Sequence, residues 1–172
     1  VDIVFKPARC RRDVAAAHRA RYEADTQTAG SVCLLVQVSL PVLLFAPKAT
    51  TLVLKGGTNA AQAPQIDYLL HVLKPTLEKH AGASFDVDIR RRGYYPRGGG
   101  EVHVSVTESL PMRASAERRH LAPISITERG DVARIHVRSF VAGTLPRHIA
   151  ERTAGSAVRM LKKHLGGDGD GG

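Results

Sequence analysis

The stretch Arg92-Gly-Tyr-Tyr-Pro-Arg-Gly-Gly-Gly-Glu101 combines residue types that can bind an anion. Arginine side chains donate charge-assisted hydrogen bonds to phosphate, and glycines let a backbone approach a ligand closely. A hairpin needs one or two special turn residues, so three consecutive glycines exceed the needs of a turn. Two interpretations remain open: a wide hairpin loop with solvated arginines, or an anion site in which Arg92 and Arg97 contact RNA or phosphate.

Two earlier stretches place small, hydroxyl and basic residues where phosphate can bind. Thr28-Ala-Gly-Ser31 precedes an apolar segment, so it either caps a helix there or offers free N–H groups to a phosphate. An ordinary cap is the commoner of the two. Lys55-Gly-Gly-Thr-Asn59 resembles a phosphate-binding loop in composition, although it lacks the Walker spacing. Its predicted place between a strand and a helix is where ligands bind in open α/β sheets.

Asp67, Pro64 and Gln37 are further candidates for a site. Asp67 either caps the helix that follows Ala63-Pro-Gln-Ile or binds a metal ion, and capping is the commoner role. Pro64 is acceptable in the first turn of that helix. Gln37 lies within an apolar segment, where a buried amide either satisfies a backbone group or faces a ligand. From the residues alone, the structural role of Gln37 is the better interpretation.

The composition favours an anionic partner. The 172 residues include 25 Lys and Arg against 16 Asp and Glu, a formal net charge of +9, which suits RNA or a nucleotide. No apolar run is long enough to cross a membrane, so no membrane association is expected. Cys10 and Cys33 match no metal-ligand spacing, and we expect free thiols in a reducing compartment. The eight histidines show no ligand spacing either, and the sequence has no Ser/His/Asp arrangement or carboxylate pair.

The elements that would position these stretches alternate between strands and helices. Residues 6–27 are polar and poorly periodic, and we expect a loop or an irregular helix there. The order of elements, βαβαββ, predicts an α+β fold, an α/β sandwich with helices on one face of a mixed sheet. Apolar and β-branched runs predict strands at residues 1–5, 51–54, 84–90 and 101–106.

Two helices are predicted in this unit. One lies within the apolar segment 32–46, where Thr28 or Ser31 caps it and Pro41 bends or ends it. The other is amphipathic, with leucines at helical spacing from residue 66 onward and a C-terminal cap at Gly82.

The remainder of the chain predicts a second, smaller unit. Strands are expected at 124–127 and 133–140, followed by a helix at 145–165. The tail contains only Gly and Asp, and we expect it to be disordered. The predicted domains are therefore 1–106, a linker at 107–122, a second domain at 123–165 and a tail at 166–172.

Taken in order, these stretches resemble the RNA 3'-terminal phosphate cyclase family. The resemblance covers about residues 24–165 and favours the enzymatic branch. Noncatalytic cyclase-like proteins, which act in ribosomal RNA processing, generally depart at the Ala-Pro-Gln-Ile-Asp-Tyr and Gly-Tyr-Tyr-Pro stretches. The residues that carry the resemblance are 28–37, 55–59, 63–68 and 92–102, extended by 126–130 and 140–143.

The resemblance implies an ATP-dependent conversion of an RNA 3'-phosphate to a 2',3'-cyclic phosphate. In the family a histidine forms a covalent adenylate, AMP passes to the RNA 3'-phosphate, and the 2'-hydroxyl displaces it. The implied cofactors are ATP and a divalent metal such as magnesium, and the implied partner is RNA with a 3'-phosphate end. Gln37 and Pro64 match positions that line the ATP site. The implied location is nuclear or nucleoplasmic in a eukaryote and cytoplasmic in a prokaryote.

No catalytic residue is assigned in this chain, because the family's nucleophilic histidine lies beyond residue 172. The expected fragment is the middle βαβαββ unit of the large cyclase domain, followed by the start of the smaller inserted domain. Such a chain is not expected to cyclise RNA alone. The alternative function is a noncatalytic, cyclase-like RNA-binding protein.

Overall fold

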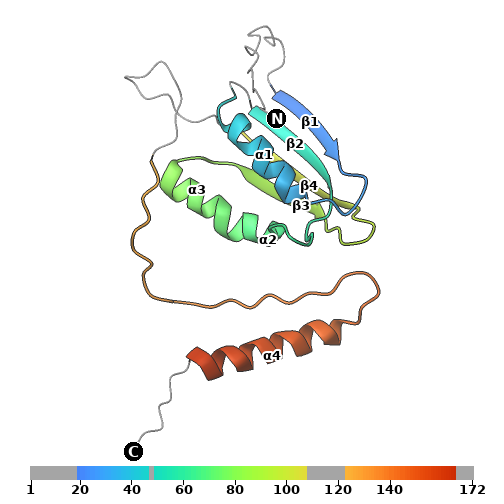
Figure 1. The fold of residues 1–172 in the computed structure, drawn as a ribbon, viewed down its shortest axis with the longest axis vertical. Coiled ribbons are helices and arrows are strands. Elements are labelled where there is room, and N and C mark those ends of the chain that lie inside the picture. The colour runs from blue at the N-terminus through green and yellow to red at the C-terminus, as the bar shows by residue number, and fades with distance from the viewer. Residues whose placement is uncertain (1–18, 47–48, 108–122, 166–172) are drawn as a thin grey trace, which may run out of the picture. The chain divides into compact units, whose positions relative to one another are not determined.

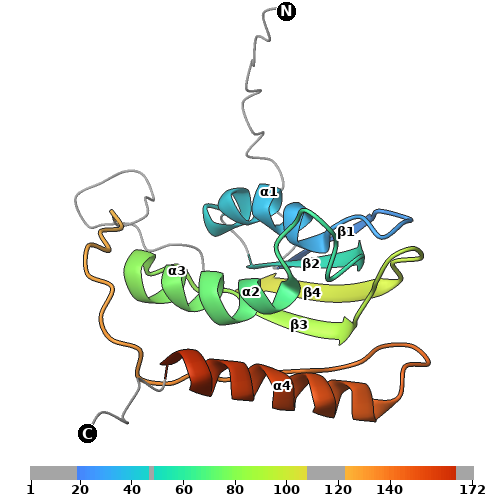
Figure 2. The same cartoon turned by 60° about the horizontal axis from the view of Figure 1, so that its bottom comes forward.

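The computed structural model describes residues 19–46, 49–107 and 123–165, and it divides the chain between Ser125 and Ile126 into two units. Each unit is described separately. The first holds a four-stranded sheet with its helices on one face, and the second holds helix α4 (Figures 1 and 2). The predicted strand at 1–5, the linker apart from residue 107, and the tail at 166–172 lie outside the described residues.

The sheet of the first unit is mixed, with strand order β1-β2-β4-β3. β1 (Arg19–Asp25) pairs in parallel with β2 (Ala49–Gly56). β4 (Gly100–Val106) lies between β2 and β3 (Asp86–Arg91) and is antiparallel to both. The order of elements is βαβαββ, which confirms the predicted α+β fold.

For residues 19–25, β1 corrects the expectation of a loop or irregular helix at 6–27, whereas residues 6–18 lie outside the described residues. Among the described strands, β1 lies at the edge of the sheet and pairs with β2 alone, so it needs little apolar surface. Its sequence, Arg-Ala-Arg-Tyr-Glu-Ala-Asp, alternates charged residues with Ala or Tyr. The period-2 pattern of a strand is therefore present, but its polarity resembles that of a loop.

Helix α1 (Val32–Leu44) begins at Ser31, whose hydroxyl accepts a hydrogen bond from the Leu34 N–H at 3.4 Å. This confirms the second of the two predicted caps. Pro41 lies inside the helix and does not end it. Proline has no N–H, so the helix lacks the bond that residue 41 would make to the carbonyl four residues earlier.

The second predicted helix is present in three consecutive pieces: α2 (Ile66–Tyr68), the π-helical segment η1 (Leu69–Leu73) and α3 (Lys74–Ala81). Pro75 explains the wider π turn, because its ring would clash with the carbonyl four residues back in a regular α-helix. Gly82 ends α3 in the left-handed conformation (φ +65°), as predicted.

The core of the first unit lies between the helices and one face of the sheet. Alternate residues of β4 are buried, whereas Glu101, His103 and Ser105 between them are partly exposed on the other face. The largest fully buried apolar side chains of this core are those of Val32, Val36, Leu54, Ile66, Phe85, Val102, Val104 and Val106.

Among its described residues, the second unit has a helix and no paired strands. Helix α4 (Arg147–Leu165) confirms the predicted helix at 145–165. The strands predicted at 124–127 and 133–140 are wrong for the described part of the chain, because residues 123–146 pair with no neighbouring strand there. A β-rich segment needs a partner to satisfy its backbone groups, and sequence pattern alone does not supply one. None of the described helices is long and apolar enough to span a bilayer.

Candidate functional site

Three loops meet at one end of the sheet and form what we call the loop cluster: residues 26–31, 57–65 and 92–99. β1, β2 and β3 run in the same direction, so the loops that follow them lie at the same end (Figure 2). The Gly57 N–H donates to the Gly30 carbonyl at 2.7 Å, and the Thr58 N–H donates to the Gly93 carbonyl at 2.9 Å. The structure therefore brings together the glycine-rich stretches that the sequence separates.

Thr58 is the centre of the loop cluster. It is fully buried, and its hydroxyl accepts the Gly93 N–H at 3.2 Å. The same hydroxyl lies 2.8 Å from Asn59 Oδ1, and the Thr58 carbonyl accepts the Ile66 N–H at 2.9 Å. Thr58 thus connects the hairpin with the start of α2. Sequence reasoning missed this role because no local pattern indicates that a threonine in a glycine-rich loop is buried.

Most glycines of the cluster are required because the loops cross backbone against backbone. A Cβ on Gly57 or Gly98 would fall within 3.0 Å of the carbonyl oxygen of Ala29 or Thr28, respectively. A Cβ on Gly100 would fall equally close to Gly56 O. Two of the three consecutive glycines are therefore needed for the close packing of backbone against backbone. This packing is a structural reason for them that a hairpin turn alone does not give.

Gly99 is the exception in this run. Its φ is +69°, and a Cβ there would have nothing within 4 Å. This is the one position of the three consecutive glycines with open space beside it.

Arg92 is tied to Asp67 in a bidentate ion pair. Its two terminal nitrogens lie 2.6 and 2.7 Å from the two carboxylate oxygens, and both side chains are three-quarters or more buried. The hydrogen bonds to Asp67 are the main reason why the pKa of Arg92 is raised, and Tyr94 adds to the effect. Asp67 lies in the first turn of α2, and the N-cap residue of this helix is Gln65 rather than Asp67. The pair attaches the hairpin to the first turn of α2.

Arg97 has a different environment from Arg92. It is exposed in the turn at the tip of the hairpin, where the Gly98 N–H donates to the Tyr94 carbonyl at 2.8 Å. Tyr95, in the same turn, is 87% exposed. The tip therefore presents one cation and one aromatic ring to solvent, while Arg92 holds its base.

Acceptors on the protein satisfy two N–H donors at the N-terminus of α1. The Val32 N–H donates to the Gly57 carbonyl at 3.0 Å, and Leu34 N–H donates to Ser31. The Thr28 hydroxyl accepts the Gly30 N–H at 3.2 Å within the preceding loop. These bonds support the ordinary cap over the phosphate site that residues 28–31 also allowed.

Gln37 and Pro64 are both exposed. The premise that Gln37 is buried was wrong, because α1 turns one apolar face to the core and leaves Gln37 on the other, beside the exposed Val38. Pro64 precedes the N-cap residue Gln65 and so lies just before the helix rather than in its first turn. Both residues have the access that contact with a nucleotide requires.

Charged side chains near the ends of the strands pair with one another. Lys55 forms an ion pair with Glu23 of the neighbouring strand, and this hydrogen bond is the main cause of its raised pKa. Glu101 accepts a hydrogen bond from His103 Nε2 at 2.8 Å, which lowers the pKa of Glu101. Lys55 is thus the penultimate residue of β2, paired with Glu23, rather than a free phosphate ligand in the loop.

No group of three or more His, Cys, Asp or Glu side chains in the described ranges is placed to hold a divalent metal, and Asp67 is engaged by Arg92. Cys33 is buried, and burial raises the pKa of its thiol to about 11, so it stays protonated and unreactive at neutral pH. Cys10 lies outside the described residues.

Comparison with known proteins identifies the family. The family model for RNA 3'-terminal phosphate cyclase matches residues 1–162. The chain belongs to the RNA 3'-terminal phosphate cyclase family. A probable RNA 3'-terminal phosphate cyclase of Dictyostelium discoideum is 42% identical over 142 residues, which is 82% of this chain and 31% of the relative.

Two further relatives are both called RNA 3'-terminal phosphate cyclase. That of Hyperthermus butylicus is 40% identical over 86% of this chain and 38% of its own length. That of Drosophila melanogaster is 36% identical over 83% of this chain and 37% of its own length. The chain therefore spans about a third of the length of the cyclase relatives it matches.

Proposed function

We propose that this chain is part of an ATP-dependent enzyme that converts an RNA 3'-phosphate into a 2',3'-cyclic phosphate. The observation that carries the proposal is the loop cluster. The stretches on which the family resemblance rests, at 28–31, 55–59, 63–68 and 92–102, are far apart in sequence and adjoin at one end of the sheet. The carboxyl ends of strands in open sheets are where ligands bind.

The reaction demands charge stabilisation and alignment more than covalent chemistry by the protein. ATP, when bound, would supply the AMP that activates the RNA 3'-phosphate, with pyrophosphate as the leaving group. The 2'-hydroxyl oxygen would then attack the phosphorus of the 3'-phosphate and lose its proton, so that the P–O2' bond forms as the bond to AMP breaks and AMP leaves. A cation beside the phosphate stabilises the charge that develops in this step.

Arg97 is the described residue best placed for that contact, because it is exposed at the hairpin tip and makes no ion pair among the described residues. Tyr95 offers an exposed ring on which a base can stack. Arg92 acts as a positioning residue, because its pair with Asp67 fixes the hairpin from which Arg97 projects. Gln37 and Pro64 are proposed contacts for ATP, in keeping with their exposure.

A chimera tests this proposal. The matched segment of the Drosophila melanogaster relative is replaced by residues 19–165 of this chain, and a 5'-labelled RNA with a 3'-phosphate is added with ATP. We expect conversion of the 3' end to a phosphatase-resistant form. No conversion should occur without ATP or with a 3'-hydroxyl end. A folded chimera that binds RNA but leaves the 3'-phosphate unchanged would contradict the proposal.

A further inference from the structure

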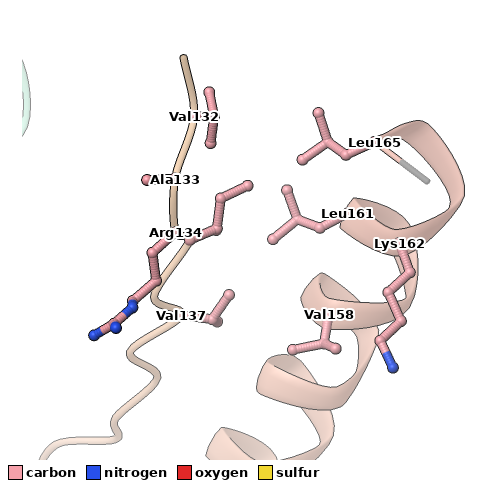
Figure 3. Close-up of a pocket in the computed structure, with 9 residues that line it drawn as sticks. Val132, Ala133, Arg134, Val137, Val158, Leu161, Lys162 and Leu165 are labelled. Atoms are coloured by element: carbon pink, nitrogen blue, oxygen red, sulfur yellow. The ribbon is translucent and has the colours of Figure 1, made fainter. Parts of the chain in front are cut away.

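Helix α4 has two chemically different faces. Val158, Leu161 and Leu165 point toward the extended segment that contains Val132 and Val137 and line one groove with it (Figure 3). Ala150 and Ala154 line the continuation of this face against residues 136–141. The apolar face is therefore directed at the extended segment of the same unit, and the opposite face of α4 is directed away from that segment.

The opposite face carries what we call the basic stripe: Arg152, Arg159 and Lys163. These residues are spaced at i, i+7 and i+11, so at about 100° per residue they fall within about 40° of one another around the helix. At about 1.5 Å per residue, the stripe is roughly 16 Å long. All three side chains are exposed.

No carboxylate neutralises the basic stripe within the described part of the chain. The one acidic residue of α4, Glu151, lies on the side that lines the groove with residues 136–141. Arg159 Nη2 donates to Ser156 Oγ at 2.9 Å, which holds the guanidinium along the helix between the other two cations. Because the Arg159 guanidinium is already ordered, its side chain loses less conformational entropy when an anion binds.

Helix stability does not account for the stripe. Cations in the last turn interact favourably with the helix dipole, and Lys163 lies there together with Lys162 and His164. Arg152 and Arg159 lie before the last turn, where the dipole effect has fallen off. Residues 126–165 contain eight Arg or Lys against three Asp or Glu, so the excess of positive charge extends beyond the stripe.

We propose that the basic stripe binds the ribose-phosphate backbone of single-stranded RNA. This inference rests on the proposed function, because an RNA whose 3' end is processed also has nucleotides on the 5' side of that end, and the protein needs to hold them. A row of cations with no carboxylate among them suits successive phosphates. The stripe itself carries no aromatic ring, so it offers no base stacking and is expected to bind without sequence preference.

The test measures RNA binding by the 172-residue chain at several salt concentrations. The probe is a fluorescent single-stranded RNA with a 3'-hydroxyl end, so neither a 3'-phosphate nor cyclisation is involved. The variant R152Q/R159Q/K163Q removes the stripe, and glutamine keeps the helix because its helix propensity is close to that of Arg and Lys. The control, R21Q/K79Q/R129Q, removes the same charge from exposed cations elsewhere.

Each lost phosphate contact lowers the slope of log K against log salt by about 0.7 for single strands, so the stripe variant should lose about 2. We expect its affinity at low salt to fall tenfold or more, whereas the control keeps its slope. Equal losses in both variants, or an unchanged stripe variant, would overturn the proposal. Single substitutions, each expected to lower the slope by about 0.7, provide the same test if circular dichroism shows that the triple variant has lost helix.

The failure of this inference and the failure of the proposed function are distinguishable. A chimera that cyclises RNA while the stripe variant binds normally would overturn the stripe alone. A stripe variant with reduced binding beside an inactive chimera would overturn the cyclase proposal alone.

Discussion

Replacing Arg92 with Gln should destabilise the first unit and reveal what the arginine does. The substitution removes both hydrogen bonds to Asp67 and leaves a carboxylate that is 19% exposed without its charge partner. Breaking a fully buried ion pair costs about 3–5 kcal/mol, and an exposed pair contributes about 0–1 kcal/mol. Because this pair is partly buried, we expect a loss of about 2 kcal/mol in the free energy of unfolding.

The assay is a double-mutant cycle with Arg92→Gln, Asp67→Asn and the double variant, measured by urea unfolding of the 172-residue chain. We expect a coupling energy of about 1–2 kcal/mol, with the double variant more stable than the sum of the single losses implies. Asp67→Asn should also reduce RNA binding if Arg92 acts by holding the hairpin. A coupling near zero, or tighter RNA binding after Asp67→Asn, would refute the positioning role and favour Arg92 as a direct phosphate ligand.

Three further predictions follow from burial and backbone geometry. Gly98→Ala should lower the free energy of unfolding by about 2 kcal/mol or more, because the new Cβ clashes with backbone and the left-handed conformation is strained for alanine. Gly99→Ala, at a similar φ but with open space around the Cβ, should lower it by about 1 kcal/mol. Equal losses in urea unfolding would contradict the crowding of the loops. Phe85→Ala, at a side chain that is 1% exposed, should cost about 3–5 kcal/mol by the same measurement, and a loss below 1 kcal/mol would remove Phe85 from the core. Cys33 in a Cys10→Ser variant should resist iodoacetamide at pH 7.5 until the chain is unfolded, and fast alkylation of the folded chain would show that the thiol is accessible. The pKa of the Cys33 thiol is about 11 in the folded chain and 9.0 in the unfolded chain, so its contribution to stability is full below pH 9 and is lost between pH 9 and 11.

Local patterns predicted the helices well. The apolar run beginning after Ser31 and the leucine spacing that ends at Gly82 are both determined by residues close in sequence, and both helices are present. β1 was missed because an edge strand can be nearly as polar as a loop. The strands expected at 124–127 and 133–140 failed for a related reason, since pairing depends on a neighbour and not on the residues of the strand.

The sequence predicted which stretches form the site but not the contacts between them. The sequence identifies the glycine-rich stretches but leaves their glycines open between a wide hairpin loop and an anion site, whereas in the structure Gly98 and Gly100 mainly accommodate neighbouring backbone. The Arg92–Asp67 pair joins residues 25 positions apart, and no pattern in the sequence marks it. The burial of Thr58 likewise depends on the hairpin that crosses it. Long-range contacts of this kind arise from the fold, so sequence reasoning could name these residues without assigning their roles.

The central claim is that the loop cluster serves the cyclisation of RNA 3' ends, and the most direct test is the rate at which the chimera with residues 19–165 forms 2',3'-cyclic ends. The rate is compared with that of the same chimera carrying Arg97→Ala, which removes the exposed cation at the hairpin tip without touching the core. We predict ATP-dependent cyclisation by the chimera and a loss of about tenfold or more in Arg97→Ala, the scale expected when one charge-stabilising contact is removed. A folded chimera without cyclisation, or an Arg97→Ala variant with an unchanged rate, would contradict this account.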